Sequence, residues 1–267
     1  MQEAPGIHPL AGKGQRSGAI LRVAIFTATR WEYAAVRRIV PDGRAHRYGG
    51  VRCIVGRRGR CEVVVARTGV GPERAAAACR DVLREHPVDL AVSAGLACAL
   101  VSAHVGDLLV GTDVRMETDG HGAAPGQRAC ADDIVRAAAR AAERAGLPVR
   151  TGSFVTARRI LWHSAEKQAM AERTGAIGLD MESAALAEAA AERQVPFAII
   201  RGVSDLVDEN LPMDFNLFLT PADWLTGLAA CVAAPSFVGG FLRLRRQMRT
   251  ASDRMSRFFE RFVDELA

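Results

Sequence analysis

Residues Gly178–Asp205 read GLDMESAALAEAAAERQVPFAIIRGVSD, a predicted helix of small residues followed by a predicted apolar strand. Glu182 stands at the start of the helical part, and Asp205 closes the strand. Each acid has an ordinary interpretation, because Glu is favoured in the first turn of a helix and Asp commonly caps a turn. Carboxylates in such apolar surroundings nevertheless cost desolvation energy. This cost makes both acids candidates for a functional site.

Outside this stretch, short apolar runs alternate with Ala-rich or amphipathic helical runs. Continuous runs rich in Val, Ile and Leu are typical of strands buried on both faces. Strands and helices that alternate along a chain favour a parallel sheet covered by helices. We therefore expect an α/β fold, a three-layer α/β/α sandwich with a mixed, largely parallel central sheet. The expected strands are residues 21–29, 61–68, 88–95, 106–114, 150–156 and 196–204, and the expected helices begin near Trp31, Pro72, Asp132, Ser164 and Met181.

The composition is that of an ordinary globular protein. The chain has 267 residues, of which 49% are hydrophobic and 24% are charged, and its net charge is +5. Its six cysteines form no CxxC pair and no Cys/His cluster, so we expect reduced core residues of a cytoplasmic protein. The same pattern implies no metal site, and no organic cofactor is expected.

Three regions are expected along the chain. Residues 1–20 are predicted to be a flexible leader, residues 21–222 a catalytic domain, and residues 223–267 an apolar segment followed by a basic amphipathic helix. The uncharged part from Trp224 to Leu242 is about long enough to cross a bilayer, but a proline and two glycines interrupt it. The helix after it can pack on the domain or on a second subunit, or lie on a membrane surface. No recognition motif supports nucleic-acid binding.

Polar stretches follow four of the expected strands, at the edge where parallel α/β sheets bind ligands. They are TATRWE with Glu32, TGVGPER, SAGLA with Ser93, and GVSD with Asp205. Taken singly, Glu32 can be a first-turn acid and Ser93 a turn residue. Because their strands are expected side by side, we predict that Glu32, Glu182 and Asp205 converge. A turn containing Ser93 and Gly95 is expected beside them.

LDMESAAL together with IIRGVSD resembles the signature of the nucleoside phosphorylase and nucleosidase superfamily. TATRWE, TGVG, SAGLA…VGD and RTGSFVT occur in the order expected of methylthioadenosine/S-adenosylhomocysteine nucleosidases, which the chain resembles. The stretch SAEKQAMAERTGAIGLDMES is also similar to the hopanoid-associated phosphorylase branch, thought to remove adenine from adenosylhopane. The resemblance covers about Leu21 to Pro212. It implies cleavage of the N-glycosidic bond of a purine (adenine-type) ribonucleoside by a homodimer or larger assembly.

The resemblance also implies a role for each acid. Asp205 would be the general acid that gives a proton to the departing purine, and burial would help it to hold that proton. Glu182 would accept hydrogen bonds from the ribose hydroxyls and stabilise the ribosyl cation. Glu32 would activate the attacking water. The other expected site residues are Met181 beneath the sugar, Phe154 stacked on the base, the backbone of Val155 at the edge of the base, Ser93 and Gly95 near the sugar or nucleophile, and Ser204 and Arg201 as supports.

Two alternatives to hydrolysis stay open. In the first, phosphate replaces water as the acceptor. The phosphorylases hold phosphate with an Arg before the Ser-Gly turn, where this chain has apolar residues, although Arg30 could hold an anion. The second is a non-catalytic binding protein on the same fold, with the basic tail as its working part. Leu96 replaces the usual second glycine of the turn, which predicts an altered pocket and either a different 5′ substituent or a less conventional acceptor. A tail peripheral to the inner membrane face would suit a lipid-linked nucleoside such as adenosylhopane.

Overall fold

A computed structural model of the chain describes residues 20–118, 126–218 and 237–267. The expected leader lies outside the described residues except for Ile20. The expected apolar segment before the C-terminal helix also lies outside them up to residue 236.

The strands form one mixed sheet. They are β1 (Leu21–Thr27), β2 (Arg44–Tyr48), β3 (Val51–Arg58), β4 (Cys61–Arg67), β5 (Leu90–Ala99), β6 (Leu108–Met116), β7 (Arg128–Ala129), β8 (Val149–Thr156), β9 (Gly178–Asp180) and β10 (Phe197–Asp205). Their order is β10-β6-β8-β9-β5-β1-β4-β3-β2, with β7 beside β6. Because β10 also pairs with β5, the strands from β10 to β5 close on themselves. The neighbours β4, β1, β5 and β10 are parallel, so their carboxyl ends share one edge of the sheet.

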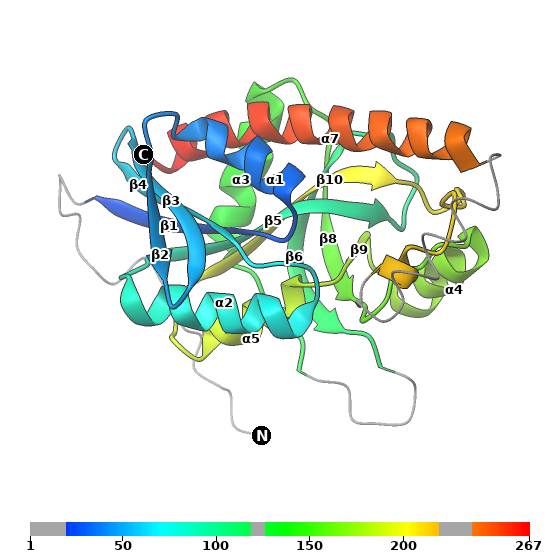
Figure 1. Cartoon of the computed structure of the whole chain (residues 1–267), viewed down its shortest axis with the longest axis horizontal. Helices are drawn as coiled ribbons and strands as arrows, with labels where there is room; N and C mark the ends of the chain where they lie inside the picture. The colour runs from blue at the N-terminus through cyan, green and yellow to red at the C-terminus, as the bar shows by residue number, and fades with distance from the viewer. Residues whose placement is uncertain (1–19, 119–125, 219–236) are drawn as a thin grey trace.

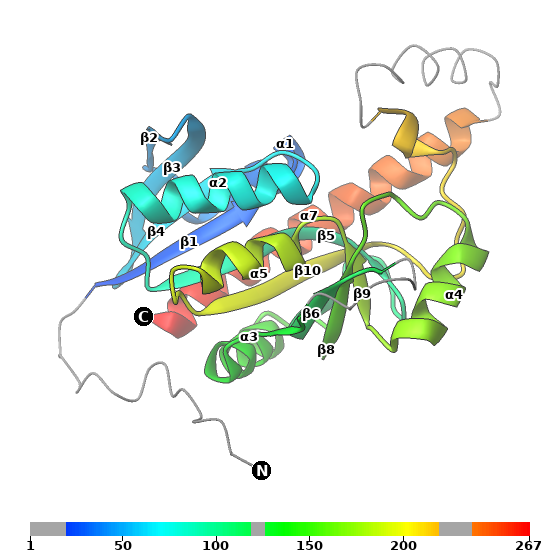
Figure 2. The same cartoon turned by 90° about the horizontal axis from the view of Figure 1, so that it is seen from below.

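Helices cover the two faces of this sheet (Figures 1 and 2). The α-helices are α1 (Arg30–Val36), α2 (Pro72–Glu85), α3 (Asp132–Arg144), α4 (Ser164–Thr174), α5 (Ser183–Ala191) and α7 (Phe237–Leu266), and short 3-10 helices span Arg37–Ile39 and Phe215–Phe218. In Figure 1, α1, α3 and α7 lie above the sheet, and α2 and α5 lie below it. The expected three-layer α/β fold with a mixed sheet is confirmed.

The two sides of β1 show how the sequence builds these layers. Val23 and Ile25 pack in one core cluster with buried residues of α1, α3 and α7. Ala24 and Phe26 pack in the other, with buried residues of α2 and α5. Successive side chains of a strand point to opposite faces, so an uninterrupted apolar run fills both cores.

The C-terminal helix α7 is part of the same body. Phe258, Phe259 and Phe262 on its apolar face are fully buried against the sheet and the neighbouring helices. Of the alternatives given above for this helix, the structure therefore shows that its apolar face packs on the domain. Among the described residues, no helix is long and apolar enough to cross a membrane.

Three parts of the sheet were not predicted: the β2–β3 hairpin, the two-residue strand β7 and β9. The hairpin of β2 and β3 was missed because β2 reads RAHRY, with exposed side chains in all but its last residue. β9 was missed because it has only three residues.

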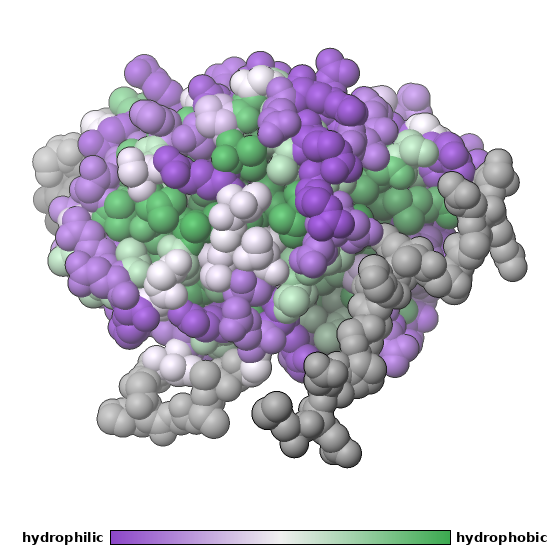
Figure 3. All heavy atoms as spheres, turned by 180° about the vertical axis from the view of Figure 1, so that it is seen from behind, coloured by the Kyte–Doolittle hydropathy of each residue, from purple (hydrophilic) through white to green (hydrophobic). Residues whose placement is uncertain are grey.

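On the face shown in Figure 3, apolar side chains lie in separate areas between hydrophilic ones. The exposed large apolar side chains within the described ranges are Ile20, Trp31 and Leu242.

Candidate active site

Arg201 is the centre of a buried polar cluster in β10. The residue is 1% exposed, although its strand neighbours are apolar. Its guanidinium donates to Oδ2 of Asp180 over 2.8 Å and to Oγ of Ser93 over 2.8 Å. Burial alone would lower the pKa of Arg201, but the surrounding carboxylates of Asp180, Glu182 and Glu32 raise it. The arginine is therefore held as a cation among acids.

Asp180 is the partner that Arg201 needs, and it was not selected from the sequence. It ends β9, and its Oδ1 accepts a hydrogen bond of 2.7 Å from the hydroxyl of Thr156. The same oxygen accepts from the backbone N–H groups of Glu182 and Ser183, so the carboxylate also caps the start of α5. The available signal was its place in LDMES, where an acid interrupts an apolar segment two residues before Glu182.

Glu182 stands at the N-cap position of α5 but does not cap its own helix. Its Oε1 accepts a 3.0 Å hydrogen bond from the backbone N–H of Gly71, in the loop before α2. Its Oε2 lies 3.9 Å from Nη2 of Arg201. Burial raises the pKa of Glu182 to about 7, against the opposing effect of Arg201. Acids that change charge near neutral pH are concentrated at functional sites.

Glu32 has contacts that fit both of its interpretations, as a first-turn acid of a helix and as a residue of the candidate site. It forms a capping box with Thr29 at the start of α1, where its Oε2 accepts from the backbone N–H groups of Ala28 and Thr29. Its Oε1 accepts a 2.8 Å hydrogen bond from the backbone N–H of Leu96. Each carboxylate oxygen has two acceptor positions. Among the described residues only Leu96 donates to Oε1, so this oxygen keeps a second acceptor position.

Ser93 and Gly95 lie within β5, so the expected turn is wrong: the pairing with β1 ends at Ser93, and the strand continues to Ala99 because it pairs with β10 and β9. Ser93 instead holds Arg201. A Cβ on Gly95 would collide with Nη1 of Arg201 and Oε1 of Glu32, so glycine allows these two groups to meet. The Leu96 side chain lies beside Gly202, on the opposite face of β5 from Gly95.

Asp205 ends β10 and has partners of its own. The pairing with β5 shifts register between Val203 and Asp205, and such bulges re-aim side chains. Oδ1 of Asp205 lies 2.9 Å from the hydroxyl of Ser204, and Oδ2 lies 2.7 Å from Nζ of Lys167. The expected apolar setting is therefore wrong, because the carboxylate faces a buried ammonium. Its hydrogen bonds do not join the Arg201 cluster.

The residues expected to contact base and sugar differ in burial. Phe154 and Val155 are both 0% exposed. The ring of Phe154 packs against Gly178 in the core, which favours a packing role over stacking on a base. Val155 belongs to a smaller core cluster beside α4. Met181, next to Glu182, is half-buried.

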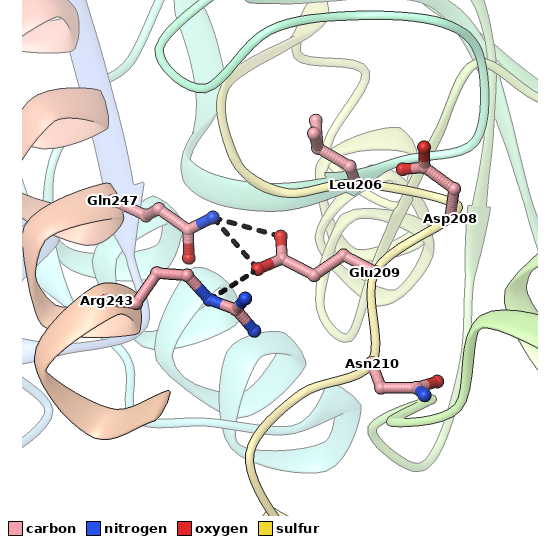
Figure 4. Close-up of a pocket in the computed structure, with 6 residues that line it drawn as sticks. All are labelled: Leu206, Asp208, Glu209, Asn210, Arg243 and Gln247. Atoms are coloured by element: carbon pink, nitrogen blue, oxygen red, sulfur yellow. Dashed lines mark hydrogen bonds and ion pairs between the residues drawn. The ribbon is translucent and has the colours of Figure 1, made fainter. Parts of the chain in front are cut away.

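Two cavities open beside α7. One, of about 490 Å³, is lined by Leu206, Asp208, Glu209, Asn210, Arg243 and Gln247 (Figure 4). The other, of about 200 Å³, is lined by Trp31, Phe215, Phe241, Leu244, Arg245 and Met248. Neither is lined by Glu32, Glu182 or Asp205, although Trp31 and Leu206 adjoin Glu32 and Asp205 in the chain. In the described part of the chain, no group of three or more His, Cys, Asp or Glu side chains could hold a metal ion.

Two relatives cover most of the chain. The 5'-methylthioadenosine/S-adenosylhomocysteine nucleosidases of Shewanella sp. (strain W3-18-1) and Shewanella baltica (strain OS195) are each 25% identical to it over 221 residues. The alignments include 78% of this chain and 96% and 94% of the two relatives.

Solved structures show the same fold. The 5'-methylthioadenosine/S-adenosylhomocysteine nucleosidase of Neisseria meningitidis, in complex with methylthio-immucillin-A, gives a TM-score of 0.73 at 23% identity, covering 91% of this chain and 99% of that one. The futalosine hydrolase of Helicobacter pylori gives 0.73 at 16% identity, covering 92% and 98%. The family model of the phosphorylase superfamily matches residues 22–222. Three quarters of the chain thus fit one family model, and the chain belongs to the phosphorylase superfamily.

Proposed function

We propose that the chain hydrolyses the N-glycosidic bond of an adenine-type purine ribonucleoside. The nucleosidase relatives are named for substrates of this class. The observation that carries the proposal is the grouping of Asp180, Glu182 and Glu32 around Arg201. Breaking a glycosidic bond develops positive charge on the ribosyl group, and carboxylates held in a buried site stabilise such charge.

Each acid has a separate step in the proposed reaction. The bond from C1′ to N9 breaks, its electron pair leaves with the purine, and Asp205 donates a proton to N7. Glu182 in its ionised form accepts hydrogen bonds from the ribose hydroxyls and stabilises the cation. Glu32 accepts a proton from the attacking water at the open position of Oε1. The positive charge of Arg201 opposes the effect of burial on the pKa of Glu182 and so favours its ionised form.

The charge of the cluster favours water over phosphate as the acceptor. A phosphate anion at this place would meet three carboxylates and one guanidinium, and like charges repel at short range. Arg30, the residue suggested to hold an anion, is exposed at the start of α1. Phosphorolysis is therefore the less favoured acceptor reaction.

Base release from nucleosides tests the proposal directly. The full chain is incubated with methylthioadenosine, S-adenosylhomocysteine, adenosine and inosine, each with and without phosphate, and free base is measured by chromatography. Release that does not require phosphate is the expected result. Strict dependence on phosphate would instead support phosphorolysis, and no release from a folded protein would contradict hydrolysis of these nucleosides. Asp205→Asn is the control for a contaminating activity.

A lipid-linked nucleoside such as adenosylhopane is a second candidate substrate. It is favoured by the exposed side chains of Leu242, Arg245 and Arg246 at the N-terminal end of α7. These suit contact with an anionic membrane surface. Flotation with anionic vesicles is expected for the full chain and should be lost when Arg245 and Arg246 are replaced by Gln. Equal flotation of both proteins would contradict the membrane contact.

A homodimer or larger assembly is proposed from the family resemblance. Light scattering coupled to gel filtration measures the mass of the full chain. A mass of one chain, 28.6 kDa, at all concentrations would contradict the assembly.

A further inference from the structure

Lys167 is a fully buried ammonium beside the proposed general acid. It lies on α4, and its side chain is 0% exposed. Nζ donates to Oδ2 of Asp205 over 2.7 Å, to the carbonyl of Leu206 over 3.2 Å and to the carbonyl of Glu209 over 2.9 Å. An ammonium has three N–H donors, so each has an acceptor. The group is held in one place and one orientation.

The chain uses lysine almost nowhere else. Of its 35 Lys and Arg residues, only Lys13 and Lys167 are lysines. The guanidinium of Arg is a planar fork that spreads its donors, whereas Lys carries its donors on one compact atom. The three acceptors around Nζ converge on a single point and therefore fit Lys rather than Arg. In an arginine-rich chain, this position has a specific requirement for a point charge.

The other titratable groups near Asp205 do not take the place of Lys167. The carboxylate of Glu209 bonds to Gln247 and Arg243 of α7, as Figure 4 shows, while the backbone carbonyl of Glu209 accepts from Lys167. Burial raises the pKa of the Cys98 thiol well above its ordinary value, so this neighbour stays neutral. Lys167 is thus the cation that is bonded to Asp205.

We propose that Lys167 is a positioning residue that fixes the Asp205 carboxyl and stabilises the carboxylate formed when Asp205 gives its proton to the purine. This inference rests on the proposed function, in which Asp205 is the general acid. The proton moves from Asp205 to N7 while the C1′–N9 electron pair moves into the purine, and solvent reprotonates Asp205 after the base has left. A cation bonded to the carboxylate stabilises the negative charge that Asp205 takes on when it gives up its proton.

The coupling of the two side chains can be measured without any substrate. Labelling with ¹³Cε-lysine gives two side-chain NMR signals, and Lys13→Arg assigns them. In Asp205→Asn the buried ammonium loses its counter-ion, so Lys167 should give up its proton at a pH lower by about one unit or more than in the wild type. Asp205→Ser is the second variant if the first does not fold. Equal titration of Lys167 with and without Asp205 would overturn the proposal, whether or not any nucleoside is cleaved.

The pH dependence of kcat/KM tests the role in turnover. Lys167→Met removes the charge and keeps an unbranched apolar side chain. We expect the alkaline limb of the pH profile of kcat/KM to move up by about one pH unit or more, and kcat to fall at least about tenfold. Lys167→Arg retains the charge but not the compact donor, so it should keep the limb closer to its wild-type position than Lys167→Met does while still lowering kcat. Arg261→Met, which removes an exposed charge on α7, is the matched control and should leave the limb unchanged.

The outcomes separate the two proposals. If the wild type releases no base, the proposed function fails and the NMR titration alone decides the coupling. If Lys167→Met is folded and loses activity with an unshifted limb, Lys167 has only a structural role and the inference is overturned.

Discussion

Nη2 of Arg201 lies 2.8 Å from Oδ2 of Asp180, and the two side chains are 2% and 1% exposed. This buried ion pair sets the charge of the candidate site, because Glu182 and Glu32 also face Arg201. Ions of opposite sign in the interior compensate each other only while both are present. Arg201 therefore allows several acids to stand close together in a place where they would otherwise repel.

Removing Arg201 alone should be strongly destabilising. We expect Arg201→Met to lower the free energy of unfolding by about 3–5 kcal/mol, because it leaves buried carboxylates without a cation. The double variant Arg201→Met/Asp180→Asn should lose less than the single variant, since it removes the unpaired charge as well. Urea unfolding of these two variants and of Asp180→Asn measures this, and single losses that add up to the double loss would show that the two side chains are independent.

Glu182→Gln should make the fold more stable and the enzyme inactive. Burial raises the pKa of Glu182 to about 7. Between the ordinary carboxyl pKa and about 7, the folded state binds more protons than the unfolded state, so stability falls as pH rises through this window. Gln carries no charge and so avoids the free energy needed to ionise a buried carboxyl group. At pH 8 the variant should therefore be more stable than the wild type by roughly 3 kcal/mol, whereas near pH 4 the difference should vanish. Base release should fall by about 10²-fold or more because the ribosyl cation loses a carboxylate.

Thermal or urea unfolding of wild type and Glu182→Gln at several pH values decides this prediction. A variant that is less stable at pH 8 would mean that the carboxylate is a net structural stabiliser. Unchanged base release would remove Glu182 from the catalytic machinery.

The fold was predictable because its signals are local. The strand from Phe197 to Asp205 and the helix before it appear in the sequence as an apolar run and a small-residue run. The β2–β3 hairpin lies outside the core on much of its surface, so Arg44–Tyr48 has no apolar alternation to reveal it. The extension of β5 beyond Ser93 depends on pairing with β10 and β9, which is a tertiary property, and Ser93 and Gly95 were therefore placed in a turn.

The site was predictable only where a residue stands out against its own segment. Glu182 and Asp205 are acids in apolar runs, and this local contrast singled them out. Lys167 sits in a helix whose charges look like a solvated face, and its partner Asp205 is 38 residues away. Residues that become partners only when the chain folds leave no pattern along the sequence. The contact of Lys167 with Asp205 was therefore not predicted.

Gly95→Ala tests whether the close approach of Arg201 and Glu32 matters. The new Cβ would overlap Nη1 of Arg201 and lie 2.5 Å from Oε1 of Glu32, and neither buried group has room to withdraw. We expect a loss of about 1–3 kcal/mol in stability from overpacking and at least a tenfold loss of base release. Gly202→Ala is the matched control on the neighbouring strand, where the nearest atom would be 3.2 Å away. Comparable effects of the two substitutions would show that the contact at Gly95 is not special.

The C-terminal helix should contribute to stability through one face and not the other. Phe259 is 0% exposed against the core, whereas Leu242 of the same helix is 60% exposed. Phe259→Ala should lower the free energy of unfolding by about 3–5 kcal/mol, because it removes a buried ring and leaves a cavity. Leu242→Ser should change it by no more than about 0.5 kcal/mol, as expected at an exposed position. Urea unfolding of both variants compares the two ends of α7 directly. Equal and small effects would mean that the helix is not docked on the sheet in solution, and its arginine-rich surface would then be free along its whole length.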